Sequence, residues 1–121
     1  MNVLIVDDHA VVRLGLKQLI QEAYPYAKLT EASASSEAHA LMGKIRWDLV
    51  VLDINLPDSN GLELLKVIKA GYPSIPVIVL SLHPEEQYAL RALRAGASAY
   101  LTKERAPDEL VSAISQALSG R

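Results

Sequence analysis

The chain has 121 residues, a length typical of one domain, and half of its residues are hydrophobic. Its formal net charge of −2 argues against a nucleic-acid-binding surface on this chain by itself, and its lack of cysteine excludes disulfides and thiolate metal sites. The opening MNVLIVDDH lacks the pattern of a signal peptide, and no apolar run approaches the ~18 residues of a membrane span. We therefore expect a cytoplasmic protein with no membrane partner.

In its first half, the chain alternates short apolar runs with helical patterns. Val3–Val6 predicts a buried strand, and a helix ending near Tyr24-Pro25 follows, marked by Val12, Leu16, Leu19, Ile20 and Ala23. Lys28–Ala32 predicts a weaker strand. A second helix, with Ser35 or Ser36 as its N-cap, is marked by Ala38, Leu41, Met42 and Ile45. Leu49–Leu52 predicts a third strand that is buried on both faces.

The second half continues the same alternation. A third helix contains Leu64, Leu65 and Ile68 and ends at Gly71, with Pro73 beyond. Pro76–Leu80 predicts the fourth strand, and a fourth helix ending at Gly96 contains Ala89, Leu90, Ala92 and Leu93. After a short strand at Ala99–Leu101, the last helix begins at Pro107 and is expected to bury Leu110, Val111, Ile114 and Leu118. Five successive βα units predict an α/β fold, a doubly wound three-layer sandwich around a five-stranded parallel sheet.

Polar residues stand where the predicted strands end. Asp7 and Asp8 follow the first strand, and Asp53 ends the third, with Asn55 two residues on. Ser81 follows the fourth strand, and Lys103 lies two residues past the fifth. Because the functional crevice of such a sheet lies at the carboxyl ends of its strands, we expect these side chains to share one pocket.

The charges of that pocket indicate its chemistry. Two carboxylates ~4 Å apart repel by roughly 4 kcal/mol at an effective dielectric near 20, so three of them require cations. Lys103 supplies one charge, and oxygen ligands with open water positions favour Mg²⁺ for the rest. A divalent ion and a lysine beside a carboxylate are typical of a phosphoryl-transfer site. Each residue alone has an ordinary explanation, as a helix cap, a turn residue or a surface lysine, and the prediction depends on their conjunction.

Four stretches together resemble a known family: VDDH, VLDINLPDSNGLELL, VIVLS and AGASAYLTK. They resemble the receiver domain of bacterial two-component response regulators, the CheY-like fold with sheet order 2-1-3-4-5. VDDH, SLH and AGASAYLTK are most similar to the NarL/FixJ subfamily, whose members usually carry a LuxR-type helix-turn-helix domain after the receiver. The resemblance implies a receiver domain over residues 1–118, with 119–121 as the start of a linker or a C-terminal tail.

The resemblance also implies a role for each site residue. Asp53 would accept a phosphoryl group from the phosphohistidine of a sensor histidine kinase. Asp8 would ligate Mg²⁺ directly and Asp7 through water, with a carboxylate oxygen of Asp53 and the main-chain carbonyl of Asn55. Lys103 would pair with the phosphoryl oxygens. Ser81 would move to hydrogen-bond that group, and Tyr100, otherwise a core aromatic, would follow as the switch. Such a domain promotes its own phosphorylation and dephosphorylation and is not a turnover enzyme.

Two positions depart from the commonest receiver pattern. Glu104 replaces the proline that often follows the lysine in a cis peptide, so the isomer of the Lys103–Glu104 bond is left open. Leu82 stands where many receivers have a small residue. We hypothesise that Leu82 and His83 restrict access to the site and slow hydrolysis of the phosphoryl group.

Several alternatives accompany this prediction. A haloacid-dehalogenase-type phosphatase also uses a strand-end aspartate, but it would want an acid where Asn55 stands. A flavin-binding flavodoxin-like protein would need a hydroxyl-rich loop in place of DDHA. The output is open between a DNA-binding domain that would follow this chain and a stand-alone receiver. A homodimer formed on phosphorylation could use the first and last helices, or the fourth helix, fifth strand and fifth helix.

Overall fold

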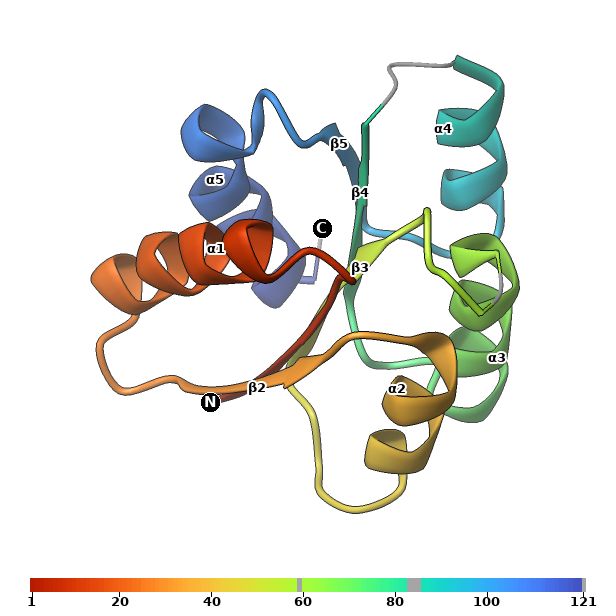
Figure 1. Ribbon diagram of the computed structural model, residues 1–121, viewed down its shortest axis with the longest axis horizontal. Helices are drawn as coiled ribbons and strands as arrows, with labels where there is room; N and C mark the ends of the chain where they lie inside the picture. Colours follow the sequence, from red (N-terminus) through yellow and green to blue (C-terminus); the bar gives the residue numbers. More distant parts are fainter. Residues whose placement is uncertain (59, 83–85, 121) are drawn as a thin grey trace.

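The computed structural model describes residues 1–58, 60–82 and 86–120, the side chain of Glu86 excepted, so His83 lies outside the described residues. Strands and helices alternate throughout. The elements are β1 (Asn2–Val6), α1 (Ala10–Ala23), β2 (Lys28–Ala32), α2 (Ser35–Met42), β3 (Leu49–Asp53), α3 (Gly61–Gly71), β4 (Val77–Ser81), α4 (Glu86–Arg94), β5 (Ala99–Thr102) and α5 (Ala106–Leu118). Helices α1 and α5 cover one face of the sheet, and α2, α3 and α4 cover the other (Figure 1).

The sheet is parallel, with the order β2-β1-β3-β4-β5, which confirms the predicted three-layer fold. The register aligns the carboxyl ends of the strands: Val6 pairs with Leu52, and Ser81 pairs with Thr102. Residues that end or follow these strands therefore meet at one edge of the sheet.

Alternation along the buried strands divides their side chains between two cores. In β3, Val50 and Leu52 join the core beneath α2, α3 and α4, whereas Leu49 and Val51 join the core beneath α1 and α5. All five residues of β3 are buried, Asp53 included. A near-continuous apolar strand is thus covered on both faces, as expected for a parallel sheet.

Two details of α2 differ from the sequence prediction. Neither Ser35 nor Ser36 is the N-cap, because the helix begins at Ser35 and its N-cap position is Ala34, which makes no side-chain cap. The N–H groups of Ser35 and Ser36 instead donate to the carboxylate of Asp58, from the loop after β3, at 2.8 and 3.0 Å. Ile45 lies beyond the helix, which ends at Met42, and is 47% exposed.

The burial predicted for the last helix was wrong at two positions. Leu110 and Ile114 face the core, but Val111 and Leu118 are 37% and 38% exposed. Positions 110, 114 and 117 form one stripe at helical spacing, and each exposed residue follows a buried one by a single position, about 100° around the helix. In α1, Ala23 is also exposed, and in α4 Leu90 and Leu93 are about half exposed around the buried Ala92.

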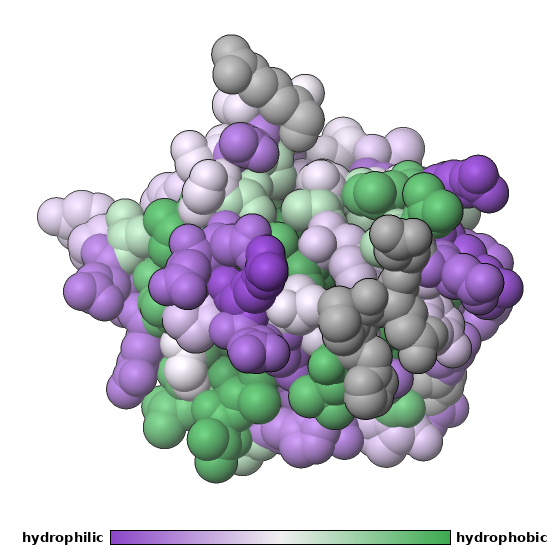
Figure 2. Space-filling view, turned by 90° about the horizontal axis from the view of Figure 1, so that it is seen from above, coloured by the Kyte–Doolittle hydropathy of each residue, from purple (hydrophilic) through white to green (hydrophobic). Residues whose placement is uncertain are grey.

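In the face shown in Figure 2, hydrophobic residues lie in several separate groups among hydrophilic ones. Within the described ranges, no helix combines the length and the apolarity needed to cross a bilayer. No cis peptide bond occurs there either, so the Lys103–Glu104 bond is trans.

Candidate functional site

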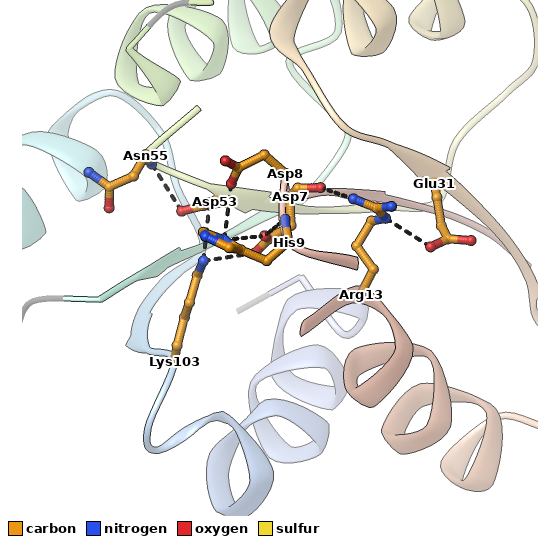
Figure 3. A network of polar contacts seen from close by, with 8 residues as sticks. All are labelled: Asp7, Asp8, His9, Arg13, Glu31, Asp53, Asn55 and Lys103. Carbon is orange, nitrogen blue, oxygen red and sulfur yellow. Dashed lines mark hydrogen bonds and ion pairs between the residues drawn. The ribbon is translucent and has the colours of Figure 1, made fainter. Parts of the chain in front are cut away.

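Two buried carboxylates share one ammonium group at the carboxyl edge of the sheet (Figure 3). Nζ of Lys103 lies 3.0 Å from Oδ2 of Asp7 and 3.1 Å from Oδ2 of Asp53. The side chains of Asp7 and Asp53 are 1% and 0% exposed, and that of Lys103 is 8% exposed. Asp53 can therefore end an apolar strand because its carboxylate points to a cation and not into the hydrophobic core.

Burial and neighbouring charge set the protonation of this group. Burial raises the pKa of Asp53, and the carboxylate of Asp7 raises it further; the N–H of Asn55 and the charge of Lys103 oppose this without cancelling it. Burial alone would lower the pKa of Lys103, but its contacts with Asp7 and Asp53 outweigh burial and raise it. Lys103 is thus a fixed positive charge between two acids.

His9 and Arg13 hold Asp7 in place. The main-chain N–H of His9 donates to Oδ1 of Asp7 at 2.8 Å, and its Nδ1 lies 3.1 Å from Oδ1 of Asp8. Arg13 donates from Nη1 to the main-chain carbonyl of Asp7 at 2.6 Å and from Nε to Glu31 at 2.9 Å. Sequence reasoning missed both residues, although Arg13 follows His9 by one helical turn and so faces the end of β1.

The loop after β3 packs tightly against the end of that strand. The N–H of Asn55 donates to Oδ1 of Asp53 at 2.9 Å, and the N–H of Gly61 donates to the carbonyl of Ile54 at 2.9 Å. A Cβ on Gly61 would lie 2.6 Å from the carbonyl oxygen of Asp53, so only glycine fits there. Asn60 caps α3 by accepting the N–H of Leu62 at 2.9 Å.

A cavity of about 540 Å³ opens beside this group. Its lining includes polar residues from three strand ends: Asp8, Asn55, Asp58, Asn60 and Ser81. Ser81 is 2% exposed and ends β4, and its carbonyl accepts the N–H of Lys103 at 2.8 Å. Tyr100 is half-buried on β5 and packs against the core beneath α2, α3 and α4. The structure therefore gathers six of the seven predicted residues around the strand ends and sets Tyr100 to one side.

The same group of acids suits a hard divalent cation. Asp7, Asp8, His9 and Asp53 can each offer one ligand atom, and these atoms lie within 4.8 Å of one another. Among the buried side-chain nitrogen and oxygen atoms that the structure describes, Oδ2 of Asp7 is the one without a hydrogen bond of good geometry, and its contact is the ion pair with Nζ of Lys103 at 3.0 Å. A carboxylate oxygen with spare acceptor capacity beside two further carboxylates fits the oxygen-rich coordination of Mg²⁺.

Comparison with known proteins identifies the family. Residues 3–115 match the model of the response regulator receiver domain. The chain is 36% identical over 119 residues to the nitrate/nitrite response regulator protein NarL of Escherichia coli K12, spanning 98% of this chain and 55% of that protein. It is 33% identical over 119 residues to the transcriptional regulatory protein DegU of Brevibacillus brevis, 98% of this chain and 50% of that protein. The chain thus spans about half the length of these curated relatives.

Solved structures agree with this assignment. A LuxR-family two-component response regulator from Aurantimonas sp. superposes with a TM-score of 0.90 at 37% identity, covering 99% of this chain and 86% of that one. A CheY-like receiver domain from Methanospirillum hungatei gives 0.88 at 28% identity, covering 98% and 94%. With its sheet order, its strand-end acids and these relatives, the chain belongs to the receiver domains of two-component response regulators, of the NarL/LuxR type.

Proposed function

We propose that Asp53 accepts a phosphoryl group from the phosphohistidine of a sensor histidine kinase, in a reaction that requires Mg²⁺. One observation carries the proposal: a fully buried carboxylate at the end of β3 lies 3.1 Å from Lys103, with Asp7 paired to the same ammonium. A purely structural acid would gain more from exposure to water than from burial next to a second acid.

In the transfer, a carboxylate oxygen of Asp53 forms a bond to phosphorus while the bond from phosphorus to the histidine nitrogen breaks. The bonding electron pair leaves with the nitrogen, and the product is an aspartyl phosphate. Lys103 stabilises the negative charge of the phosphoryl oxygens through a fixed ammonium. Two features orient Asp53: the N–H of Asn55 on one oxygen and Lys103 on the other.

Asp8, Asp7, Asp53 and the carbonyl of Asn55 would hold the Mg²⁺ ion, Asp7 through water. When bound, the ion supplies positive charge that neutralises the acids and the phosphoryl oxygens. The new phosphoryl group adds about −1.5 to −2 charges, if phosphoserine is a guide. We infer that the hydroxyl of Ser81, which lines the cavity, moves to this group and that Tyr100 follows it inward. The added charge shifts the population toward the arrangement of Ser81 that makes the better contacts with the phosphoryl group.

The output of the switch is the second part of the proposal. The curated relatives are about twice as long as this chain, and one is named a transcriptional regulatory protein. We propose a receiver domain over residues 1–118, followed by a linker and a helix-turn-helix domain through which alone DNA would be bound. A stand-alone receiver is the alternative. RcsB of Salmonella enterica is one structural relative. A solved structure shows that protein bound to promoter rprA in the presence of phosphomimetic BeF3−.

A homodimer that forms on phosphorylation would use one of two faces. Val11 and Leu14 of α1 are 83% and 55% exposed, and Leu90 and Leu93 of α4 are about half exposed. Size-exclusion chromatography with and without a phosphate mimic, on variants of each face, would identify the one used. As a phosphoacceptor that is modified and then hydrolysed, the chain would not act as a turnover enzyme. Because a histidine kinase draws its phosphoryl group from ATP, we expect the chain to act in the cytoplasm.

The experiment that tests the proposal locates the phosphoryl group. The protein is incubated with a small acyl phosphate and Mg²⁺, treated with hydroxylamine to convert an aspartyl phosphate into a stable hydroxamate, and digested for mass spectrometry. We expect the modification on Asp53. A modification on Asp7 or Asp8 would show that the acceptor is wrongly assigned, and steady release of inorganic phosphate from a stable phosphoester would favour the phosphatase alternative.

A further inference from the structure

The helix cap supplied by Asp58 connects the proposed metal site to α2. Both oxygens of its carboxylate are engaged, Oδ1 by the N–H of Ser35 and Oδ2 by the N–H of Ser36. The two donors lie 22 and 23 residues away in the sequence. These bonds lower the pKa of Asp58, so its carboxylate stays ionised at neutral pH. Each oxygen accepts one main-chain N–H of α2, so this carboxylate is a structural contact between the loop and the helix.

Asp58 lies three residues after Asn55, whose carbonyl is one of the proposed metal ligands. Leu56 and Pro57 separate them, and the fixed φ angle of Pro57 restricts the conformations between the two residues. The base of the loop is closed by the bridge between Asn55 and Asn60 and by the cap that Asn60 gives α3. In the described part of this loop, the two bonds to α2 hold Asp58 in place, while Leu56 packs against the core beneath α2, α3 and α4.

From these contacts we propose that Asp58 is a positioning residue for the Mg²⁺ site: by binding the N-terminus of α2 it fixes the loop in the arrangement that directs the Asn55 carbonyl at the ion. The inference rests on the proposed function. Thermodynamic linkage limits the effect, because the coupling between cap and ion cannot exceed what the cap contributes. A side-chain helix cap changes an equilibrium constant by about fivefold.

The chain offers a matched control for this effect. Glu37, also in the first turn of α2, accepts the N–H of Ser33 at 2.6 Å and so contributes to the same helix end. Within the described part of the chain, its carboxylate bonds to Ser33 and not to the loop after β3, whereas Asp58 belongs to that loop. Loosening α2 through Glu37 therefore separates a general loss of helix stability from a loss of loop position.

The test is calorimetric titration of the unphosphorylated protein with Mg²⁺. Asp58→Ala should raise the dissociation constant by more than twofold and by at most about fivefold. Asp58→Asn should restore part of the affinity because its amide oxygen still accepts one N–H, and Glu37→Ala should stay within twofold of wild type. Unchanged affinity in Asp58→Ala, or an equal loss in Glu37→Ala, would overturn the inference. If Asp58→Ala does not fold, Asp58→Asn serves as the test. A dissociation constant raised about twofold would support the inference, and an unchanged one would contradict it. A wild-type protein that does not bind Mg²⁺ would instead overturn the proposed function.

Discussion

Replacing Lys103 by methionine removes the one charge that lies between Asp7 and Asp53. At 3.0 and 3.1 Å, each contact contributes about 5 kcal/mol of gross attraction at an effective dielectric near 20. Much of that gain is offset by the cost of burying the ammonium, so we expect the free energy of unfolding to fall by about 3–5 kcal/mol. Methionine keeps the length of the side chain, so the loss reports mainly on charge.

The pH dependence of this loss follows from Asp53. Its pKa lies above the ordinary value, first because it is buried, and without Lys103 it must rise further. A carboxyl whose pKa is raised in the folded state destabilises the protein above that pKa, and the penalty is relieved as the pH falls and the group takes up a proton. The deficit of Lys103→Met should therefore be smaller at pH 5 than at pH 7.

Urea unfolding in the presence of a chelator measures both effects. Trp47 is the only tryptophan, is 3% exposed, and gives a fluorescence signal for unfolding. Lys66→Met is the control, because Lys66 is 57% exposed and 3.6 Å from Glu63, and its loss should stay below about 0.5 kcal/mol. The reasoning is refuted if Lys103→Met lies within about 1 kcal/mol of wild type, or if its deficit is as large at pH 5 as at pH 7.

Three further predictions concern the surroundings of the site. Gly61→Ala should destabilise the protein by about 2 kcal/mol in urea, since its Cβ would lie 2.6 Å from main-chain atoms. Gly15→Ala, with nothing within 4 Å of the added Cβ, should stabilise the protein by about 0.5–1 kcal/mol. Equal effects of the two substitutions on the free energy of unfolding would contradict the packing argument. The pKa of Glu31 is lowered by its hydrogen bond with Arg13, so its contribution to stability should be present above the ordinary pKa of 4.5 and lost as the pH falls through the lowered value. The urea midpoint of Glu31→Gln should then differ from that of wild type at pH 6, and the difference should shrink as the pH falls below 4.5. A constant difference would argue against the ion pair. Leu82, which follows Ser81, is 55% exposed. Leu82→Ala should shorten the lifetime of the phosphoprotein several-fold. An unchanged lifetime would show that Leu82 does not restrict access to the phosphoryl group.

The fold and most of the candidate site followed from patterns that are local in the sequence. A run such as Leu49–Leu52 predicts a buried parallel strand without knowledge of its neighbours. Once the strands are parallel, their carboxyl ends share an edge, and Asp7, Asp53 and Lys103 must approach one another. The prediction succeeded there because topology, not side-chain detail, determines the result.

The features that sequence patterns did not predict are contacts between elements. The cap of α2 comes from Asp58, which is 23 residues from Ser35 and 22 from Ser36, and a nearby serine was the better local candidate. Arg13 reaches the Asp7 carbonyl only because of how α1 is oriented against β1. Val111 seemed apolar enough for the core, but a rotation of one residue around α5 brings it to the edge. Such contacts depend on the packing of elements, which spacing along the chain does not determine.

The measurement that tests the central claim most directly is the intact mass of the protein after incubation with a small acyl phosphate, with Mg²⁺ or with excess chelator. Asp53→Asn removes the proposed acceptor, and Asp48→Asn, an exposed acid at the other end of β3, is the matched control. We predict one added phosphoryl group in wild type and Asp48→Asn, dependent on Mg²⁺, and none in Asp53→Asn. An adduct that survives in Asp53→Asn, or that forms equally well in chelator, would contradict the assignment of this site as a metal-dependent aspartyl phosphoacceptor.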